Sequence, residues 1–339
     1  MNKKIILITN YNNEIPQILH ETVSLDVRSL KDILGTEFEC ESYTLDEFSN
    51  LLLEGIQIES TFFYIASSQI ESYKMAIVDV AFEIKSRGGV LIPGFEFYLS
   101  HENKYYQELY KSRVGVETPK SKLFTHAKKS DVKALPYSKT VIKSYNGFGS
   151  VGVKLVNTEL NFNNALLSSM THYVFSGLGG IARNATKFFY KYRNKYPSSF
   201  GRVVAQEFIP SLQFDWKVLV FSENVFSLKR YVRPNDFRAS GSGKFDYRAE
   251  IPDTLVKFAS YIRKKLNVPF VSLDIAETEN GEFFVIEYQA VHFGMATVVN
   301  AKRYHTILNN EVVQVDVEAK IKVENLFAES IIKFVNEGA

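Results

Sequence analysis

The most constraining feature of this chain is a hairpin signal near the C-terminus with an acid on each arm. Asn280-Gly281 stands between two β-rich runs, residues 271–276 and 282–289. Both turn residues tolerate the positive φ of a type I′ turn, so we predict a two-residue turn there. In the register set by that turn, Asp274 lies directly opposite Glu287.

The two faces of this hairpin differ in character. Ser272 pairs with Gln289 on the face that carries the two acids, because side chains alternate along a strand. The other face is apolar and suits a core, with Leu273, Ile275, Ile286 and Tyr288.

Two like charges opposite each other on a sheet repel, so they need a positive charge between them. A hard divalent cation bound by carboxylate oxygens meets that need, and Mg²⁺ holding phosphates is its commonest form. The alternative is a pair of solvated surface acids. If a metal lies between them, replacing Asp274 or Glu287 with Ala should relieve repulsion in the metal-free protein and leave the fold largely intact.

Composition places the chain among ordinary globular proteins and excludes some functions. Its 339 residues suffice for two or three domains, and a net charge of +2 gives no reason to expect a nucleic-acid or membrane partner. Cys40 is the only cysteine, which excludes disulfides within the chain and thiolate clusters. The first apolar run is too short for a signal peptide, and no window approaches a membrane span of roughly 20 residues. We therefore expect a cytoplasmic protein.

Three regions follow from the pattern along the chain. Residues 1–118 alternate strand and helix signals, including a Ser68-x-x-Glu71 capping box before an amphipathic helix, and they predict a parallel α/β domain. Residues 119–203 are β-rich around a glycine loop, with a helix expected near residues 186–196. Residues 204–339 are mostly strand, with a helix over 252–266 and a closing helix in the last twenty residues.

The glycine loop matches a well-known pattern in the wrong context. Residues 147–152 read G-x-G-x-x-G, but a β run follows, whereas a dinucleotide-binding loop opens a helix. No Gly-Lys-Ser/Thr follows either. A glycine loop between antiparallel strands is a flap whose amides can close over phosphates, with Lys143 projecting at the same groups. The alternative is a flexible hairpin tip that binds nothing.

The motifs and their order along the chain resemble those of the ATP-grasp superfamily, over roughly residues 90–295. That family includes D-alanine–D-alanine ligase and the ribosomal-protein glutamate ligases. The matching segments are Asn103-Lys104 with Pro119, Lys143 with the glycine loop, Gln206-Glu207-Phe208-Ile209 with Asp215, and Asp274-Ile275 with Glu287 and Gln289.

The resemblance implies an α/β fold, α+β in its C-terminal part. The expected fold comprises an N-terminal domain over 1–118, a small lid subdomain over 119–203 and a larger antiparallel C-terminal subdomain over 204–339. The resemblance also implies an ATP site. By resemblance, the phosphates are contacted by Lys104 and Lys143 and covered by Gly147, Gly149, Ser150 and Gly152. The adenine is bound by Gln206, Glu207, Phe208 and Ile209, and the ribose by Asp215.

Metal and charge complete the implied site. Asp274, Glu287 and Gln289 would hold Mg²⁺, with Mn²⁺ as the alternative. Gln289 departs from the family's asparagine, the usual Pro-Gly after it is missing, and Ser144 replaces the proline after the flap lysine. Related ligases carry arginines near the transferred phosphoryl group, and here the matching positions are Arg230 and Arg238, with Arg233 a weaker match. The alternative is a solvated loop with ordinary surface arginines. Lys122 and Lys217 are secondary candidates for phosphate contacts, and His292 is a candidate for a substrate contact; the alternative for His292 is the structural role that a lone histidine more often has.

The implied activity is that of an ATP-dependent carboxylate–amine ligase. A kinase acting on a hydroxyl and a nucleotide-binding regulatory module without turnover are the two alternatives. The substrates would be a small carboxylate and an amine, such as an amino acid, a peptide or a carboxylated sugar. Dimers are common among similar ligases.

Overall fold

The computed structural model describes residues 3–17, 24–127, 133–145, 152–172, 199–234 and 236–338. The chain divides into two units. Unit 1 comprises Met1–His101, Ser112–Glu117 and Leu212–Ala339, and unit 2 comprises Glu102–Lys111 and Thr118–Ser211. Each unit is described by itself below.

The N-terminal part of unit 1 is a parallel sheet in the order β4-β1-β5-β6. Its central strand β1 is almost completely buried, as expected for a parallel sheet with both faces covered. The predicted parallel α/β arrangement is confirmed. The strands are β1 (Lys4–Thr9), β4 (Glu39–Thr44), β5 (Phe62–Ile65) and β6 (Val90–Leu91), and the helices are α1 (Val27–Leu34), α2 (Leu45–Leu53), α3 (Glu71–Ser86) and α4 (Phe95–Ser100). A short ribbon pairs β2 (Ile15–Pro16) with β3 (Ser24–Leu25).

One local prediction in this region is wrong. Helix α3 begins at Glu71 with Ile70 as its N-cap, and no side chain caps it. Ser68 Oγ accepts a hydrogen bond from the Ile70 N–H at 3.1 Å, so it is used before the helix starts. A capping box does form at α2, where Thr44 and Glu47 satisfy each other's backbone amides.

The C-terminal part of unit 1 is an antiparallel sheet in the order β16-β15-β12-β13-β17-β18, with β14 also paired to β13. Helix α8 ends at Asn267, whose left-handed φ of 55° terminates the helix. The strands are β12 (Phe214–Phe221), β13 (Asn224–Tyr231), β14 (Phe245–Asp246), β15 (Phe270–Glu277), β16 (Phe283–Gln289), β17 (Arg303–Leu308) and β18 (Glu311–Asp316); the helices are α8 (Asp253–Leu266), α9 (Ala296–Val299) and α10 (Val323–Asn336).

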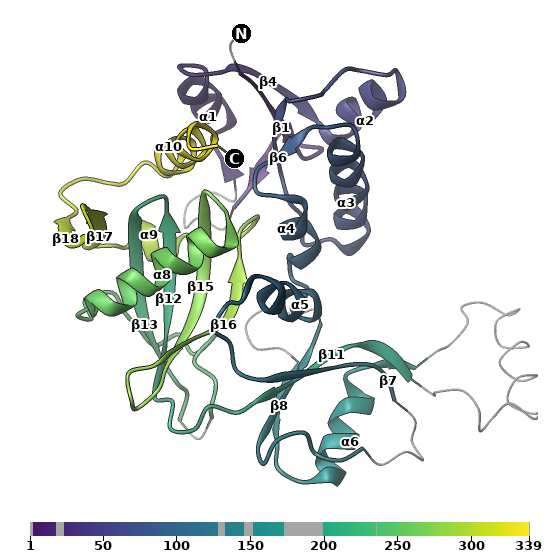
Figure 1. Ribbon diagram of the computed structural model, residues 1–339, viewed down its shortest axis with the longest axis vertical. Coiled ribbons are helices and arrows are strands. Elements are labelled where there is room, and N and C mark those ends of the chain that lie inside the picture. Colours follow the sequence, from purple (N-terminus) through teal and green to yellow (C-terminus); the bar gives the residue numbers. More distant parts are fainter. Residues whose placement is uncertain are drawn as a thin grey trace, which may run out of the picture. The chain divides into compact units, whose positions relative to one another are not determined.

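A buried hydrophobic cluster contains residues of both sheets of unit 1. Phe327 of α10 packs against Phe270 and Phe221 with ring centroids 4.6 and 5.2 Å apart, in edge-on geometries that aromatic pairs prefer. Leu7 of β1 and Leu219 of β12 belong to the same buried cluster. Helix α10 returns beside α1 (Figure 1), which closes this core with the last helix of the chain.

Unit 2 is an antiparallel sheet in the order β10-β11-β8-β9, with β7 also paired to β11. Helix α6 packs on it (Figure 1) through Phe162 and Leu166, which lie against Ile142 and Val203. The elements are α5 (Lys104–Val114), whose last turn belongs to unit 1, then β7 (Ser121–Ala127), β8 (Thr140–Ser144), β9 (Val153–Val156), α6 (Glu159–Ser168), β10 (Thr171–His172) and β11 (Ser199–Glu207). In the described parts of both units, no helix is long and apolar enough to cross a membrane.

Removing side-chain volume from the core of unit 1 should be costly. We expect Leu219→Ala to lower the free energy of unfolding by about 2–5 kcal/mol, because Leu219 is fully buried and its loss leaves a cavity. Leu53→Ala is the matched control, since Leu53 is 86% exposed and its loss should change stability by less than about 0.5 kcal/mol. Urea denaturation of the two variants measures the difference, and equal effects would contradict this core.

Candidate functional site

The predicted site residues fall into two groups, one in each unit. Unit 1 holds Asp215, Arg230, Arg238, Asp274, Glu287 and Gln289, and unit 2 holds Lys104, Lys143, Gly152, Gln206, Glu207, Phe208 and Ile209. Gly147, Gly149 and Ser150 lie outside the described residues, as does the helix predicted near residues 186–196.

The acidic hairpin of unit 1 has the predicted pairing at its acids. Asp274 of β15 is paired with Glu287 of β16, and Ser272 is paired with Gln289. The side chain of Asp274 is 15% exposed. The two carboxylates therefore stand on the same face of the sheet, on neighbouring strands.

The turn that leads to this pairing differs from the prediction. The Thr278 N–H donates to the Glu282 carbonyl, and the Gly281 N–H donates to the Thr278 carbonyl, both at 2.9 Å, so the loop has three residues. Gly281 has a φ of 76°, whereas Asn280 has no positive φ, which is the pattern of a three-residue loop closed by a left-handed glycine. The predicted type I′ turn is wrong.

A β-bulge then restores the predicted register. Ile275 is paired with Val285, so Ile286 is an extra residue on β16 before Glu287 meets Asp274. Val285 takes the buried place opposite Ile275, and Ile286 is only partly buried. The longer loop and the bulge shift the register in opposite directions, and their effects cancel at the acids.

Two cations of the protein lie against Asp274 and against a second acid of the same sheet, Asp215. Lys217 lies opposite Asp274 on β12, with Nζ 2.8 Å from Oδ1. Arg230 lies opposite Asp215 on β13 and bonds both of its oxygens, at 2.7 and 2.9 Å. The Arg230 Nη2 also lies 2.9 Å from Asp274 Oδ2. We call these four residues and Glu287 the charge row; it crosses four neighbouring strands on one face and carries one carboxylate in excess.

Burial and pairing shift the acidities in the charge row. Burial raises the pKa of Asp274, but Arg230 and Lys217 outweigh it, and the pKa falls below its ordinary value. Burial instead raises the pKa of Asp215 overall, despite the contact with Arg230. Burial alone would lower the pKa of Arg230, but the charges of Asp274 and Asp215 raise it. Asp274 is thus held ionised by its two cations.

Gln289 is held from two sides. Its Nε2 donates to Glu287 Oε1 at 3.2 Å, and its Oε1 lies 3.3 Å from Nδ1 of His101. Burial, together with the nearby His292, lowers the pKa of His101 to about 3, so this imidazole is neutral. His292 is half-buried and donates through Nδ1 to the Pro16 carbonyl at 3.1 Å. His101 was not anticipated from the sequence, since a lone histidine after a short helix carries no signal.

The predicted arginine loop is largely bonded to itself. Arg238 makes contacts of 2.7–3.0 Å with both oxygens of Asp236, two residues earlier. Those hydrogen bonds raise the pKa of Arg238 and lower the pKa of Asp236. Arg233 donates to the Gly241 carbonyl at 2.7 Å, which ties the two ends of the loop together.

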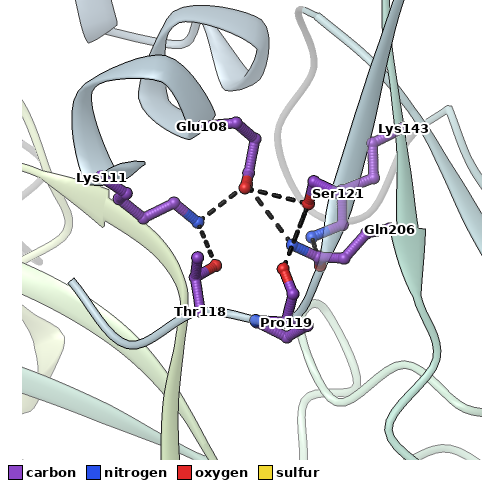
Figure 2. Close-up of polar contacts among 7 residues, drawn as sticks. All are labelled: Glu108, Lys111, Thr118, Pro119, Ser121, Lys143 and Gln206. Atoms are coloured by element: carbon purple, nitrogen blue, oxygen red, sulfur yellow. Dashed lines mark hydrogen bonds and ion pairs between the residues drawn. The ribbon is translucent and has the colours of Figure 1, made fainter. Parts of the chain in front are cut away.

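Unit 2 contains a buried polar network around Glu108 of α5 (Figure 2). Lys143 of β8 donates to Gln206 Oε1 at 2.6 Å, and the Gln206 amide nitrogen lies 3.4 Å from Glu108 Oε1. Ser121 of β7 donates to Glu108 Oε2 at 3.0 Å. Lys143 is therefore held by Gln206, which is itself held by the start of β7 and by α5.

A fully buried lysine balances Glu108 (Figure 2). Lys111 donates to Glu108 Oε1 at 2.7 Å and to Thr118 Oγ1 at 2.9 Å. Sequence reasoning missed both residues of this pair. Their i, i+3 spacing was the available signal, but in a helix rich in charged residues that spacing is typical of an exposed face.

The remaining unit 2 candidates lie at strand ends. The Lys104 N–H donates to the Tyr145 carbonyl at 2.9 Å, which places the start of α5 beside the end of β8, just after Lys143. The Glu207 and Phe208 N–H groups donate to the carbonyls of Lys120 and Lys139. Of the predicted adenine-binding residues, Ile209 is the one whose N–H donates to no described residue.

Gly152 marks the end of the glycine loop. Its φ is 75°, and a Cβ there would lie 2.9 Å from Ser144 Oγ, so both conformation and space favour glycine. The loop joins β8 and β9, which pair antiparallel, and β9 rather than a helix follows it. The prediction that a strand follows the loop, where a dinucleotide-binding loop would open a helix, is confirmed.

The Glu108–Lys111 pair should be essential for stability. We expect Glu108→Leu to lower the free energy of unfolding by about 3–5 kcal/mol, because it leaves Lys111 charged and unpaired in the interior. The double variant Glu108→Leu, Lys111→Met should recover most of that loss. Glu83→Ala, which breaks the exposed pair with Arg87, should cost less than about 1 kcal/mol in the same urea titration. A double variant no more stable than Glu108→Leu would contradict this account.

Asp274 should stabilise the fold, although its repulsion from Glu287 alone would predict that replacing it does no harm. We expect Asp274→Ala to lower the free energy of unfolding by about 1–3 kcal/mol, because Lys217 and Arg230 lose an acceptor. Glu279→Ala, in the exposed turn of the same hairpin, should change it by less than about 0.5 kcal/mol. Denaturant titration at neutral pH compares them. A gain in stability in Asp274→Ala would mean that repulsion from Glu287 dominates.

Comparison with known proteins gives similarity of structure only. No family model matches the sequence. No curated protein matches it either. Among solved structures, D-cycloserine synthetase DcsG superposes with a TM-score of 0.51 at 12% identity, covering 97% of this chain and 99% of that one. D-alanyl-alanine synthetase A from Vibrio cholerae O1 biovar eltor str. N16961 also gives 0.51 at 12% identity, covering 99% and 98%.

Both matches cover nearly the whole chain, so the similarity includes both units. The order of elements agrees with the resemblance of the motifs: a parallel α/β part, an antiparallel sheet that carries the glycine loop, and an antiparallel sheet that carries the acidic hairpin. The chain has the ATP-grasp fold.

Proposed function

We propose that this protein is an ATP-dependent carboxylate–amine ligase. It would form an amide bond through an acyl phosphate and release ADP and phosphate. The observation that carries the proposal is the charge row, in which Asp274 and Glu287 stand together on one face of the sheet with Lys217 and Arg230 beside them. Two solved proteins that share the fold are named synthetases, which supports the same class of reaction.

The donors of the hairpin fit a magnesium ion that is bound together with a nucleotide. Mg²⁺ is usually held by one or two carboxylates and completes its octahedron with phosphates and water. Asp274 and Glu287 supply two carboxylates, and the described residues contain no cluster of three or more His, Cys, Asp or Glu that would form a protein cage. Mn²⁺ takes the same oxygen ligands. When bound, the ion would neutralise charge that develops during phosphoryl transfer.

Lysines of unit 2 would neutralise the phosphates. Lys143 is held by Gln206, so its ammonium has a defined position before any ligand binds. Lys104 begins α5 beside the end of β8. Gln206 would thus have two roles: it would orient a phosphate-binding lysine and, as predicted, lie next to adenine. The Ile209 N–H, which donates to no described residue, would donate to an adenine nitrogen.

Arg230 would act on the transferred phosphoryl group. Its Nε and Nη2 are used by Asp215 and Asp274, whereas its Nη1 donates to no described residue. The carboxylates hold the guanidinium plane, and Nη1 would donate to phosphoryl oxygen as charge builds there. Arg238 would have to leave Asp236 to do the same. Asp215 stays our prediction for the ribose hydroxyls, because each of its oxygens has a second lone pair.

The substrates would be a small carboxylate and an amine, from the classes of amino acids, peptides and carboxylated sugars. A screen of pooled carboxylates and amines, followed by ADP release and product mass, tests the proposal. A ligase needs both substrates before ADP appears. Turnover driven by one hydroxyl compound alone, with a stable phosphate ester as product, would establish a kinase and overturn the proposal.

The two acids should be required for turnover. We expect Glu287→Gln and Asp274→Asn to reduce ADP release by about 100-fold or more, because each removes a charge from the metal site, which is worth several kcal/mol. Glu279→Gln, in the turn of the same hairpin, should retain wild-type turnover. Thermal unfolding of each variant separates lost activity from lost fold. Wild-type activity in Glu287→Gln would remove Glu287 from the metal site.

A further inference from the structure

Strand β16 ends with an amide whose two ends have different partners. The Nε2 of Gln289 lies 3.2 Å from Glu287 Oε1, and its Oε1 lies 3.3 Å from His101 Nδ1. This position is one of the chain's departures from the ATP-grasp pattern, where an asparagine is usual. The partners of the amide decide which of its atoms is available to a metal.

The chemistry of the partners fixes the orientation of the amide. An ionised carboxylate only accepts hydrogen bonds, so the Gln289 atom that faces Glu287 must be the NH₂ group. The amide oxygen then faces His101, and an oxygen accepts. The Nδ1 of His101 therefore carries the proton in this contact, and the Ser68 backbone carbonyl is a second acceptor near the ring. This assignment does not depend on distinguishing nitrogen from oxygen by shape, which is the usual source of error for amides.

The imidazole of His101 is fixed by its surroundings in unit 1. His101 is 4% exposed and directly follows α4, and Phe97 of that helix packs edge-on against Tyr288, the neighbour of Gln289, at 6.0 Å. The ring of His292 lies 5.9 Å from the ring of His101.

Gln17 holds the segment that carries His292. Its Nε2 donates to the Val291 carbonyl at 2.8 Å, and its Oε1 accepts from the Phe293 N–H at 3.0 Å. The segment that carries His292, which lies against His101, is therefore tied to the N-terminal part of the unit.

We propose that His101 is a positioning residue that holds the Gln289 amide with its nitrogen toward Glu287. Gln289 then donates to a metal-binding carboxylate and keeps its own oxygen on His101. The protein ligands of the metal would be Asp274 and Glu287. This inference rests on the proposed function and deepens it, since it replaces the Gln289 ligand implied by the family pattern with a donor to Glu287.

The opposite arrangement requires the other tautomer of His101. If Gln289 offered its oxygen to a metal at Glu287, the amide would turn over and its nitrogen would face Nδ1 of His101. That nitrogen donates, so the proton of His101 would have to leave Nδ1 for Nε2. A ligating Gln289 is therefore linked to a change of tautomer in His101, which is directly observable.

The first test follows that tautomer. Long-range ¹H–¹⁵N NMR of the wild-type protein assigns the protonated ring nitrogen of His101, before and after addition of Mg²⁺ with a non-hydrolysable ATP analogue. We expect the proton on Nδ1 in both samples. A proton that moves to Nε2 when metal and nucleotide are added would make Gln289 a metal ligand and overturn the inference.

The second test uses matched substitutions of His101. Asparagine places an N–H near the Nδ1 position, whereas glutamine places it near Nε2. We expect His101→Asn to bind Mn²⁺ in the presence of ADP within about 2-fold of wild type. His101→Gln and His101→Leu should bind it about 10-fold more weakly, because the Gln289 amide would no longer be held as a donor to the metal ligand Glu287. The dissociation constants come from electron paramagnetic resonance of free Mn²⁺, with thermal unfolding as a check on the fold.

Failure of this inference differs from failure of the proposed function. If wild-type protein binds no Mn²⁺ with ADP, both are overturned. If wild type binds it and all three His101 variants bind it equally well, only the role of His101 is overturned. The NMR measurement is made on the native protein, so a variant that does not fold leaves that test intact.

Discussion

The charge row is the interaction on which the C-terminal sheet of unit 1 depends. A carboxylate as buried as Asp274 is costly unless cations lie against it, and here Lys217 and Arg230 do so from two neighbouring strands. Lys217 is directly opposite Asp274 on β15, and Arg230 is directly opposite Asp215 on β12. A slip of one residue would turn these charges into the core and bring apolar side chains to the surface, so the row specifies the register of β12, β13 and β15 as well as neutralising the site.

The hairpin shows why register can be predicted when backbone detail cannot. Asn280-Gly281 indicated a turn, and the alternation of Leu273, Ile275 and Tyr288 required one face to be buried, which leaves few acceptable pairings at Asp274. The loop length and the bulge at Ile286 were not specified by those residues, because both turn types accept a glycine at position 281. Burial of the flanking strands constrains the pairing of the acids, and the bulge at Ile286 compensates for the extra residue in the loop.

The fold class and several charged candidates were within reach of the sequence, but their contacts were not. Alternating strand and helix signals, and a β run after Gly152, are local patterns that predict architecture. Glu108 and His101 act through partners nearly 100 and nearly 190 positions away, Gln206 and Gln289. In their own segments of the sequence they look like an ordinary surface acid and a lone histidine. Such residues become recognisable only when the fold places a second polar group against them.

The balance of charge also constrains the order in which ligands would arrive. The row has one carboxylate in excess, and Asp274 already faces two cations, so a bare divalent ion gains little there and meets repulsion from Lys217 and Arg230. A metal ion complexed to a triphosphate carries net negative charge, and its phosphate oxygens would attract the same two cations. The protein's own charges therefore favour entry of metal and nucleotide as one complex over the capture of a free ion. On this reasoning Lys217 and Arg230 would hold Asp274 ionised until that complex arrives, and Arg230 would then offer its remaining Nη1 to the phosphates.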